Sequence, residues 1–202
     1  MNDNLKQKDM EKFEDLFKDL EVQSDMTKKF SEIAEKLMNN FVIKANNKDY
    51  RLAEIEFYLY EKGKHEDTFI HANVLEEKKP NKAAKLQSKM ACWYFHYSGI
   101  DITFGNENGR FGGILIRSLV SSLVNPTNEL VGPLKLKNEL LNLYQEIDKS
   151  RDFLKLSISK KPLSIVPKPL VRFNLGKSGD QKFKEMKYRF ILPEIEKWVK
   201  KA

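Results

Sequence analysis

The stretch that decides the fold is Trp93 to Val120, WYFHYSGIDITFGNENGRFGGILIRSLV. Its first part, Trp93 to Phe104, shows the period of two that is typical of a β-strand, with aromatic side chains on both faces. Its last part, Gly113 to Val120, is apolar and rich in β-branched residues. Because a segment rich in Gly and Asn separates the two parts, the sequence predicts a β-hairpin with one long strand in each arm.

Arg117 interrupts the apolar run of the second arm, ILIRSL. A guanidinium in such a run needs an acceptor for its hydrogen bonds or a polar cavity to face. The sequence therefore predicts a carboxylate close to Arg117.

A second alternating segment, Tyr50 to Tyr60, follows a short strand and a turn at residues 46–49. Its polar side chains Glu54, Glu56 and Tyr58 share one face, at intervals of roughly 6 to 7 Å. A solvated sheet face is the simplest interpretation of this pattern, and a site facing Arg117 is the alternative. The positions that we expect to face the core are Ala53, Ile55, Phe57 and Leu59.

The rest of the chain mixes helical patterns with short strands and has no βαβ rhythm. This order predicts a single α+β domain with a curved, mostly antiparallel β-sheet flanked by helices. The expected helices are at 13–20, at 30–37 after Ser24 and Asp25, from Pro133 through Leu136, Leu140, Leu141, Tyr144 and Ile147, and from Pro193 onward. The other expected segments are a strand at 41–44, an irregular excursion at 61–90, irregular or edge structure at 150–170, and strands at 170–175 and 188–192.

Charge is unevenly distributed along the chain. The net charge is +7, and residues 130–202 contain 17 basic but only 8 acidic side chains. A surplus of this kind is compatible with a polyanion such as nucleic acid and also with a surface that is simply soluble. Lys182, Lys184 and Lys187 are the cluster that we expect to contact DNA.

The sequence carries no sign of a membrane segment, a metal site or a nucleotide cofactor. The first ten residues lack the apolar core of a signal peptide, which favours a cytoplasmic protein. His65, Asp67 and His71 match no strong zinc pattern, and the Gly-rich segment at 105–113 does not fit a phosphate-binding loop. His96 is expected to be a hydrogen-bonded core residue. We therefore expect no metal and no cofactor, and a monomer.

Several motifs, taken in order, resemble the alkylpurine (3-methyladenine) DNA glycosylase family. They are AEIEFYL at 53–59, ILIRSL at 114–119, GPLKL at 132–136 and YRFIL at 188–192. The resemblance spans roughly residues 30 to 192, so the chain is expected to consist of an N-terminal helix at 1–22 and a glycosylase-like α+β domain at 23–202. It implies that a damaged nucleotide is flipped out of DNA and that its N-glycosidic bond is hydrolysed without a metal.

The resemblance also implies roles for individual residues. Glu56 matches the Glu of the family's ExYL motif, which activates water for attack on the anomeric carbon, and Arg117 matches the arginine that holds this carboxylate. Tyr58 and Phe95 match the aromatic side chains that stack on the flipped base. Asp67 occupies the position of the family's pocket histidine, and His65 and His71 are the nearby candidates for that role; we expect His71 in the base pocket.

One departure bears on the function. Where the family has a Tyr that fills the gap left by the flipped nucleotide, this chain has Ser98, and the alternation places Tyr97 on the opposite face. Three functions therefore remain: a DNA glycosylase, a nucleic-acid-binding protein that has lost excision, and a hydrolase of a small nucleoside.

Overall fold

The computed structural model describes residues 12–45, 47–72, 82–121, 123, 130–142, 154–177 and 179–196. Its helices and strands form a single α+β unit, as expected. In chain order they are α2 (Thr27–Asn40), β1 (Phe41–Ala45), β2 (Lys48–Glu61), β3 (His65–Glu66), α3 (Lys82–Gln87), β4 (Met90–His96), β5 (Gly99–Phe104), β6 (Arg110–Val120), β7 (Leu130–Val131), α4 (Pro133–Asn142), β8 (Leu154–Ile158), β9 (Lys168–Leu170), α5 (Gln181–Glu185), β10 (Arg189–Ile191) and the 3₁₀ helix η2 (Pro193–Ile195).

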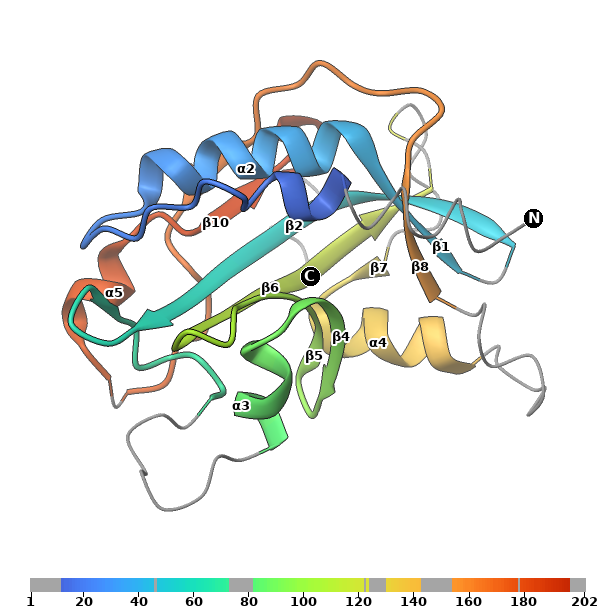
Figure 1. The fold of residues 1–202 in the computed structure, drawn as a ribbon. Coiled ribbons are helices and arrows are strands. Elements are labelled where there is room, and N and C mark those ends of the chain that lie inside the picture. Colours follow the sequence, from blue (N-terminus) through green and yellow to red (C-terminus); the bar gives the residue numbers. More distant parts are fainter. Residues whose placement is uncertain are drawn as a thin grey trace.

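Strand β2 is the centre of a curved, antiparallel, 10-stranded sheet, whose main order is β4-β5-β6-β2-β1-β8. One edge of β2 pairs with β6 along most of its length. The other edge pairs in succession with β1, β10 and β3. Figure 1 shows α2 lying across one face of this sheet, and α3 and α4 beside the strands β4 and β5.

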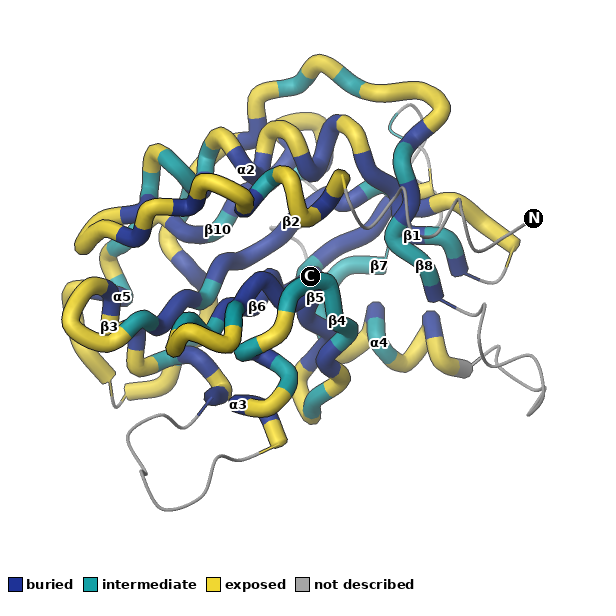
Figure 2. The backbone as a smooth tube through the Cα atoms, viewed as in Figure 1, coloured by how far each residue is buried: buried dark blue, intermediate teal, exposed yellow. Residues whose placement is uncertain are grey.

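The hydrophobic core lies between α2 and the sheet. Ile55 and Phe57 are fully buried, as the alternation predicted, and so are Ala53 and Leu59. Phe30 of α2 stacks on Phe57 with ring centroids 4.4 Å apart, because the apolar face of the helix lies directly over the apolar face of β2. Figure 2 shows that β2 and β6 are buried along most of their length.

The other face of β2 is not the solvated face of the simplest interpretation. The relative solvent exposure is 1% for Glu54 and 0% for Glu56. A glutamate side chain that is free in solution is charged at neutral pH. Two buried carboxylates on one strand require cationic or hydrogen-bonding partners. The polar face of β2 at Glu54 and Glu56 is therefore part of the protein interior and not a solvated surface.

The predicted hairpin is correct in its second half and wrong in its first. Strands β5 and β6 pair antiparallel around the Gly-rich and Asn-rich turn. However, the chain reverses at Tyr97 and Ser98, so the aromatic arm consists of two paired strands, β4 and β5. The predicted strand at 170–175 is also wrong, because β9 ends at Leu170 and the chain leaves the sheet there.

The remaining expectations are partly confirmed. Leu136 and Leu140 of α4 are buried, whereas Tyr144 and Ile147 lie outside the described residues. The helix expected from Pro193 begins as the 3₁₀ helix η2, and Trp198 lies outside the described residues. Across the described ranges, every helix is too short or too polar to traverse a lipid bilayer.

Candidate functional site

A cavity of about 450 Å³ opens on the polar side of β2. Its walls come from β2, the loop at 69–71, the β4–β5 hairpin, β6, the start of α4 and the segment at 173–176. The volume falls within the roughly 300 to 1,000 Å³ that is typical of small-molecule sites. Tyr58, His71, Tyr97 and Arg117 all line it, in agreement with four of the site residues expected from the sequence.

Arg117 binds the two carboxylates of β2 at the inner end of this cavity. Its Nε donates to Glu54 Oε1 at 3.0 Å, and its Nη1 lies 3.4 Å from Glu56 Oε1. The β2–β6 register passes from Glu54/Ser118 to Ile55/Ile116, so Arg117 has no partner in the ladder. Such a bulge redirects a side chain, and here it accompanies an arginine that serves both glutamates. The carboxylate predicted near Arg117 is thus Glu56 together with Glu54.

Glu56 lies behind the cavity wall and does not line the cavity. Its Oε1 accepts from the Phe173 amide at 2.9 Å, and its Oε2 accepts from the Tyr58 hydroxyl at 2.8 Å. Burial raises the pKa of the Glu56 carboxyl, and Arg117 and these two hydrogen bonds oppose that shift. The expectation that Glu56 itself faces water in the cavity is therefore wrong, because the side chain has no solvent exposure.

Tyr58 stands between Glu56 and the cavity. Burial, with the charge of Glu56, raises the pKa of the Tyr58 hydroxyl well above its ordinary value. The hydroxyl therefore keeps its proton and remains a donor to Glu56. The guanidinium of Arg172 lies over the Tyr58 ring, 4.6 Å from its centroid, and fixes the ring from the far side.

Asp67, which occupies the family's histidine position, belongs to the interior. It pairs with Arg172, whose Nη1 is 2.5 Å from Oδ2, and neither side chain is exposed. His65 is also buried, and its Nδ1 lies 2.9 Å from the Gln23 carbonyl oxygen. These two residues therefore do not join His71 in one site. Nothing in the sequence pointed to Arg172, since its partner lies 105 residues away.

A second group of polar side chains forms the opposite wall. His71, Gln87, His96 and Asp101 line the cavity together, and Gln87 Nε2 donates to Asp101 Oδ2. His96 Nε2 lies 3.1 Å from Asp101 Oδ1, and its Nδ1 lies 3.0 Å from Ser98 Oγ. The expectation that His96 is a hydrogen-bonded, interior residue is confirmed in part: its side chain is 6% exposed and contacts Asp101 and Ser98, but it also lines the cavity. The sequence signal was its polar position beside Tyr94 in an aromatic strand.

The two aromatic side chains expected from β4 have different positions. Phe95 is 37% exposed and does not line the cavity, because successive side chains of a strand point to opposite faces. Its expected place as a wall of the pocket is therefore wrong. Tyr97 is 89% exposed and lies at the tip of the β4–β5 turn, where it lines the cavity mouth. Phe173, which is half exposed, lines the cavity instead of Phe95.

The lysines expected to contact DNA lie in and after α5. Lys182 and Lys187 are exposed, and Lys184 is half-buried with its Nζ donating to the Lys177 carbonyl oxygen at 2.9 Å. Lys177 directly follows Gly176, which lines the cavity. Lys184 therefore supports a loop of the cavity wall, whereas the side chains of Lys182 and Lys187 are exposed.

Comparison with known proteins gives no function. No protein-family model matches the chain. The chain is similar to the uncharacterized protein L759 of Acanthamoeba polyphaga mimivirus, with 29% identity over 140 residues that cover 57% of this chain and 58% of the viral protein. The match thus spans little more than half of that relative, and the site has to be interpreted from its own geometry.

Proposed function

We propose that this protein is a DNA glycosylase, which hydrolyses the N-glycosidic bond of a damaged purine that has been flipped out of DNA. The observation that carries the proposal is the chain of contacts from the cavity through Tyr58 to the buried Glu56 and Arg117. The order of motifs that resembles the alkylpurine DNA glycosylases supports the same activity.

In this proposal Glu56 acts through Tyr58 and not by direct contact with water. The Tyr58 hydroxyl donates to Glu56 Oε2 and can accept a hydrogen bond from a water molecule in the cavity. As that water attacks the anomeric carbon, one proton passes from water to the tyrosine oxygen while the tyrosine proton passes to Glu56. The C–N bond breaks and its electron pair leaves with the base. General-base assistance of this kind contributes roughly 10² to 10⁴ in rate.

Arg117 keeps Glu56 ionised before the reaction. Burial opposes the charge of Arg117, but Glu56 and Glu54 outweigh burial and raise the pKa of its guanidinium. Arg117 therefore remains a cation beside Glu56 and limits the rise of that carboxyl pKa. Phe173, with Arg117 5.5 Å and Arg189 5.7 Å from its ring centroid, offers an aromatic face in the cavity for a base to stack on.

Tyr97 supplies what Ser98 lacks. A tight turn breaks the strand alternation, so Tyr97 is not confined to the face opposite the cavity. An aromatic ring at the cavity mouth can enter the base stack in place of the extruded nucleotide, at an energy of roughly 1 to 3 kcal/mol for base stacking.

The test is to incubate the protein with duplexes carrying alkylated purines, hypoxanthine or ethenoadenine and to measure abasic sites. We expect abasic sites with the unmodified protein, and rates at least about 100-fold lower for Glu56→Gln and Tyr58→Phe. A matched control is Glu32→Gln, an exposed glutamate of α2.

The sealed position of Glu56 favours one alternative, a nucleic-acid-binding protein that holds a flipped base without excision. Binding to these duplexes without abasic sites, under all conditions tried, would establish that alternative. Release of base from free nucleosides but not from DNA would instead establish a nucleoside hydrolase.

A further inference from the structure

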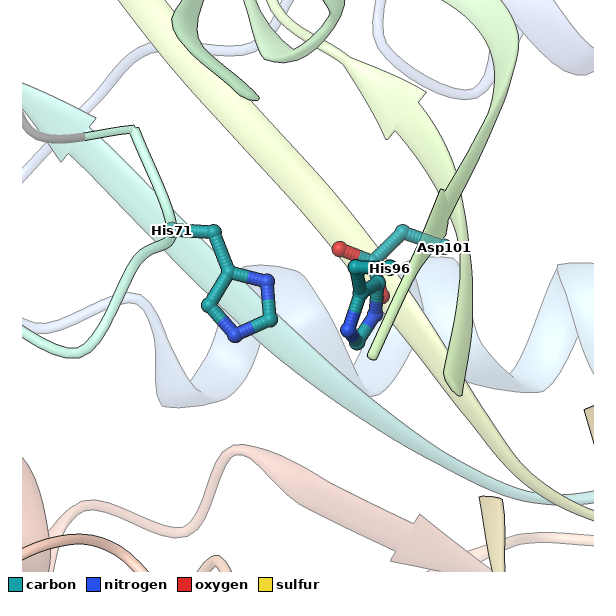
Figure 3. Close-up of side chains that lie close together, drawn as sticks. All are labelled: His71, His96 and Asp101. Atoms are coloured by element: carbon teal, nitrogen blue, oxygen red, sulfur yellow. The ribbon is translucent and has the colours of Figure 1, made fainter. Parts of the chain in front are cut away.

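His71, His96 and Asp101 bring their ligating atoms together at one wall of the cavity. One atom from each lies within 4.8 Å of the other two. Figure 3 shows the His71 ring turned toward His96 and Asp101 from a separate segment of the chain. His96 Nε2 and Asp101 Oδ1 are 3.1 Å apart. The distances that can approach 4.8 Å are therefore those from His71, which is exposed, to the other two residues.

We propose that these three side chains bind one divalent transition-metal ion, Zn²⁺ foremost. Two imidazoles and one carboxylate, with a fourth position left open, are a donor set that zinc uses in catalytic sites. Metal–ligand bonds of about 2.0 to 2.2 Å in a tetrahedron place ligand atoms roughly 3.3 to 3.5 Å apart. The 3.1 Å pair already has nearly that spacing. His71 needs to move by no more than roughly 1 to 2 Å to complete it.

Outer hydrogen bonds orient two of the three ligands. A proton on His96 Nδ1 directed at Ser98 Oγ, 3.0 Å away, leaves the lone pair of Nε2 for the metal. Gln87 Nε2 donates to Asp101 Oδ2 at 3.3 Å, which leaves Oδ1 for the metal. Such partners fix the orientation of the rings and carboxylates that bind metals.

Gln87 also connects Asp101 to the loop of the third ligand. Its Oε1 accepts from the amide of Ala72, the residue after His71, at 2.7 Å. Gly113 leaves room for this bridge, because a Cβ there would lie 2.9 Å from both Gln87 Nε2 and Asp101 Oδ2. The Gln87 side chain thus connects three segments that are distant in the sequence, namely α3, β5 and the loop at His71 and Ala72.

The open coordination position faces the cavity, since all three ligands line it. A bound ion would therefore be reachable by a water molecule or by an oxygen or nitrogen atom of a cavity ligand. Arg117 and Lys135 line the same cavity and add positive charge to it. The inference concerns metal binding and does not depend on glycosylase activity.

The test is titration of the metal-free 202-residue protein with Co²⁺, followed by visible absorption and by metal analysis after gel filtration. We expect one equivalent of cobalt, which Zn²⁺ displaces. His71→Ala and Asp101→Asn should weaken binding at least about 100-fold, and Ser98→Ala should weaken it roughly 10-fold without changing the stoichiometry.

Cys92→Ser is the matched control, because Cys92 is the chain's single thiol and lies on β4 with His96. It should bind cobalt as the unmodified protein does. Far-ultraviolet circular dichroism and the metal-free melting temperature verify that each variant is folded, and His71→Ala changes an exposed side chain. Absence of cobalt binding by the unmodified protein, or unchanged affinity in both His71→Ala and Asp101→Asn, would overturn the proposal.

Discussion

The guanidinium of Arg172 and the carboxylate of Asp67 form an ion pair in which neither side chain touches solvent. Arg172 also donates to the carbonyl oxygens of Phe57 and Phe183. The pair therefore ties the loop after β3 to the centre of β2 and to α5. Removal of one partner leaves an uncompensated charge in the interior.

Arg172→Met should lower the free energy of unfolding by about 3 to 5 kcal/mol, because Asp67 stays buried without its cation. Urea denaturation measures this change. Lys168→Met, which breaks the partly exposed pair with Glu196, should cost less than about 1 kcal/mol. Equal decreases in the two variants would mean that the interior pair contributes no more than a surface pair.

The two faces of β2 should be almost equally intolerant of truncation. Ile55→Ala should cost about 2 to 5 kcal/mol as a core truncation. The sequence pattern alone predicts a mild effect for Glu54→Ala. In the structure, however, Glu54 accepts from Arg117 and Ser118 and lies 3.5 Å from Arg189, so we expect at least about 2 kcal/mol. Thermal and urea unfolding measure both.

Glu32→Ala is the control for this comparison, since Glu32 is half-exposed on α2, and its effect should stay within about 0.5 kcal/mol. If Glu54→Ala behaves like Glu32→Ala, the buried carboxylate has no energetic partner in Arg117.

Glu56 should make stability and excision depend on pH in opposite senses. Its carboxyl pKa is raised in the folded state, so the folded protein binds this proton more tightly than the unfolded chain does. The contribution to stability is complete below the ordinary glutamate pKa and is lost as pH rises through the raised pKa. The stability of the unmodified protein minus that of Glu56→Gln should therefore fall across this window, in denaturation series at several pH values.

Excision should rise over the same window, because the ionised carboxylate is the form that accepts a proton. A pH–rate profile whose acidic limb falls at or below the ordinary glutamate pKa would contradict this assignment. The Glu56→Gln variant should lack that limb.

Tyr97 and Phe95 lie two residues apart and should differ in function. Tyr97→Ala should reduce excision and duplex binding about 10-fold or more, because the ring at the cavity mouth is removed. Phe95→Ala should leave both nearly unchanged, since Phe95 does not line the cavity. Single-turnover rates and fluorescence anisotropy test this, and a larger effect from Phe95→Ala would place the nucleic acid on the other face of the β4–β5 hairpin.

Binding to duplex DNA should weaken steeply with salt and should depend on the basic C-terminal part. Replacing Lys182, Lys184 and Lys187 by Ala should flatten the plot of log Kd against log salt by about 0.9 for each phosphate that the protein no longer neutralises. Lys44 on β1, Lys48 at the start of β2 and Lys160 after β8 are the control lysines, because β1 and β8 lie at the other end of the sheet from α5 (Figure 1). Replacing them should leave the slope unchanged. If the unmodified protein and both triple variants give the same slope, Lys182, Lys184 and Lys187 do not contact the DNA.

The sequence predicted β2 and its two faces because a strand alternates with a period of two, whatever its neighbours are. It also predicted the contact between Glu56 and Arg117, because an arginine in an apolar run requires an acceptor. It did not predict that Glu56 would be covered. That closure comes from the backbone amide of Phe173, 117 residues away, and no side-chain pattern encodes it.

The opposite wall could not be predicted for a related reason. Gly99 follows the turn at Tyr97 and Ser98, and Ser-Gly is a turn signal. The alternation of the sequence nevertheless continues through this point, and it predicts one strand where the structure has β4 and β5. Without that reversal, His96 and Asp101 do not face each other. Their junction with Gln87 further depends on the helix α3, in a stretch with no clear period.

The burial of the polar face of β2 has a consequence for folding during synthesis. The first third of the chain supplies three buried carboxylates, Glu54, Glu56 and Asp67, whereas Phe173 and the cations Arg172 and Arg189 come from the last fifth. A growing chain that ends before these residues has β2, β6 and Arg117, which binds Glu54 and Glu56, but it lacks the cation that pairs with Asp67 and the amide that covers Glu56. The native arrangement therefore requires nearly all of the sequence, including β10, which pairs with β2 at Glu54 and Glu56.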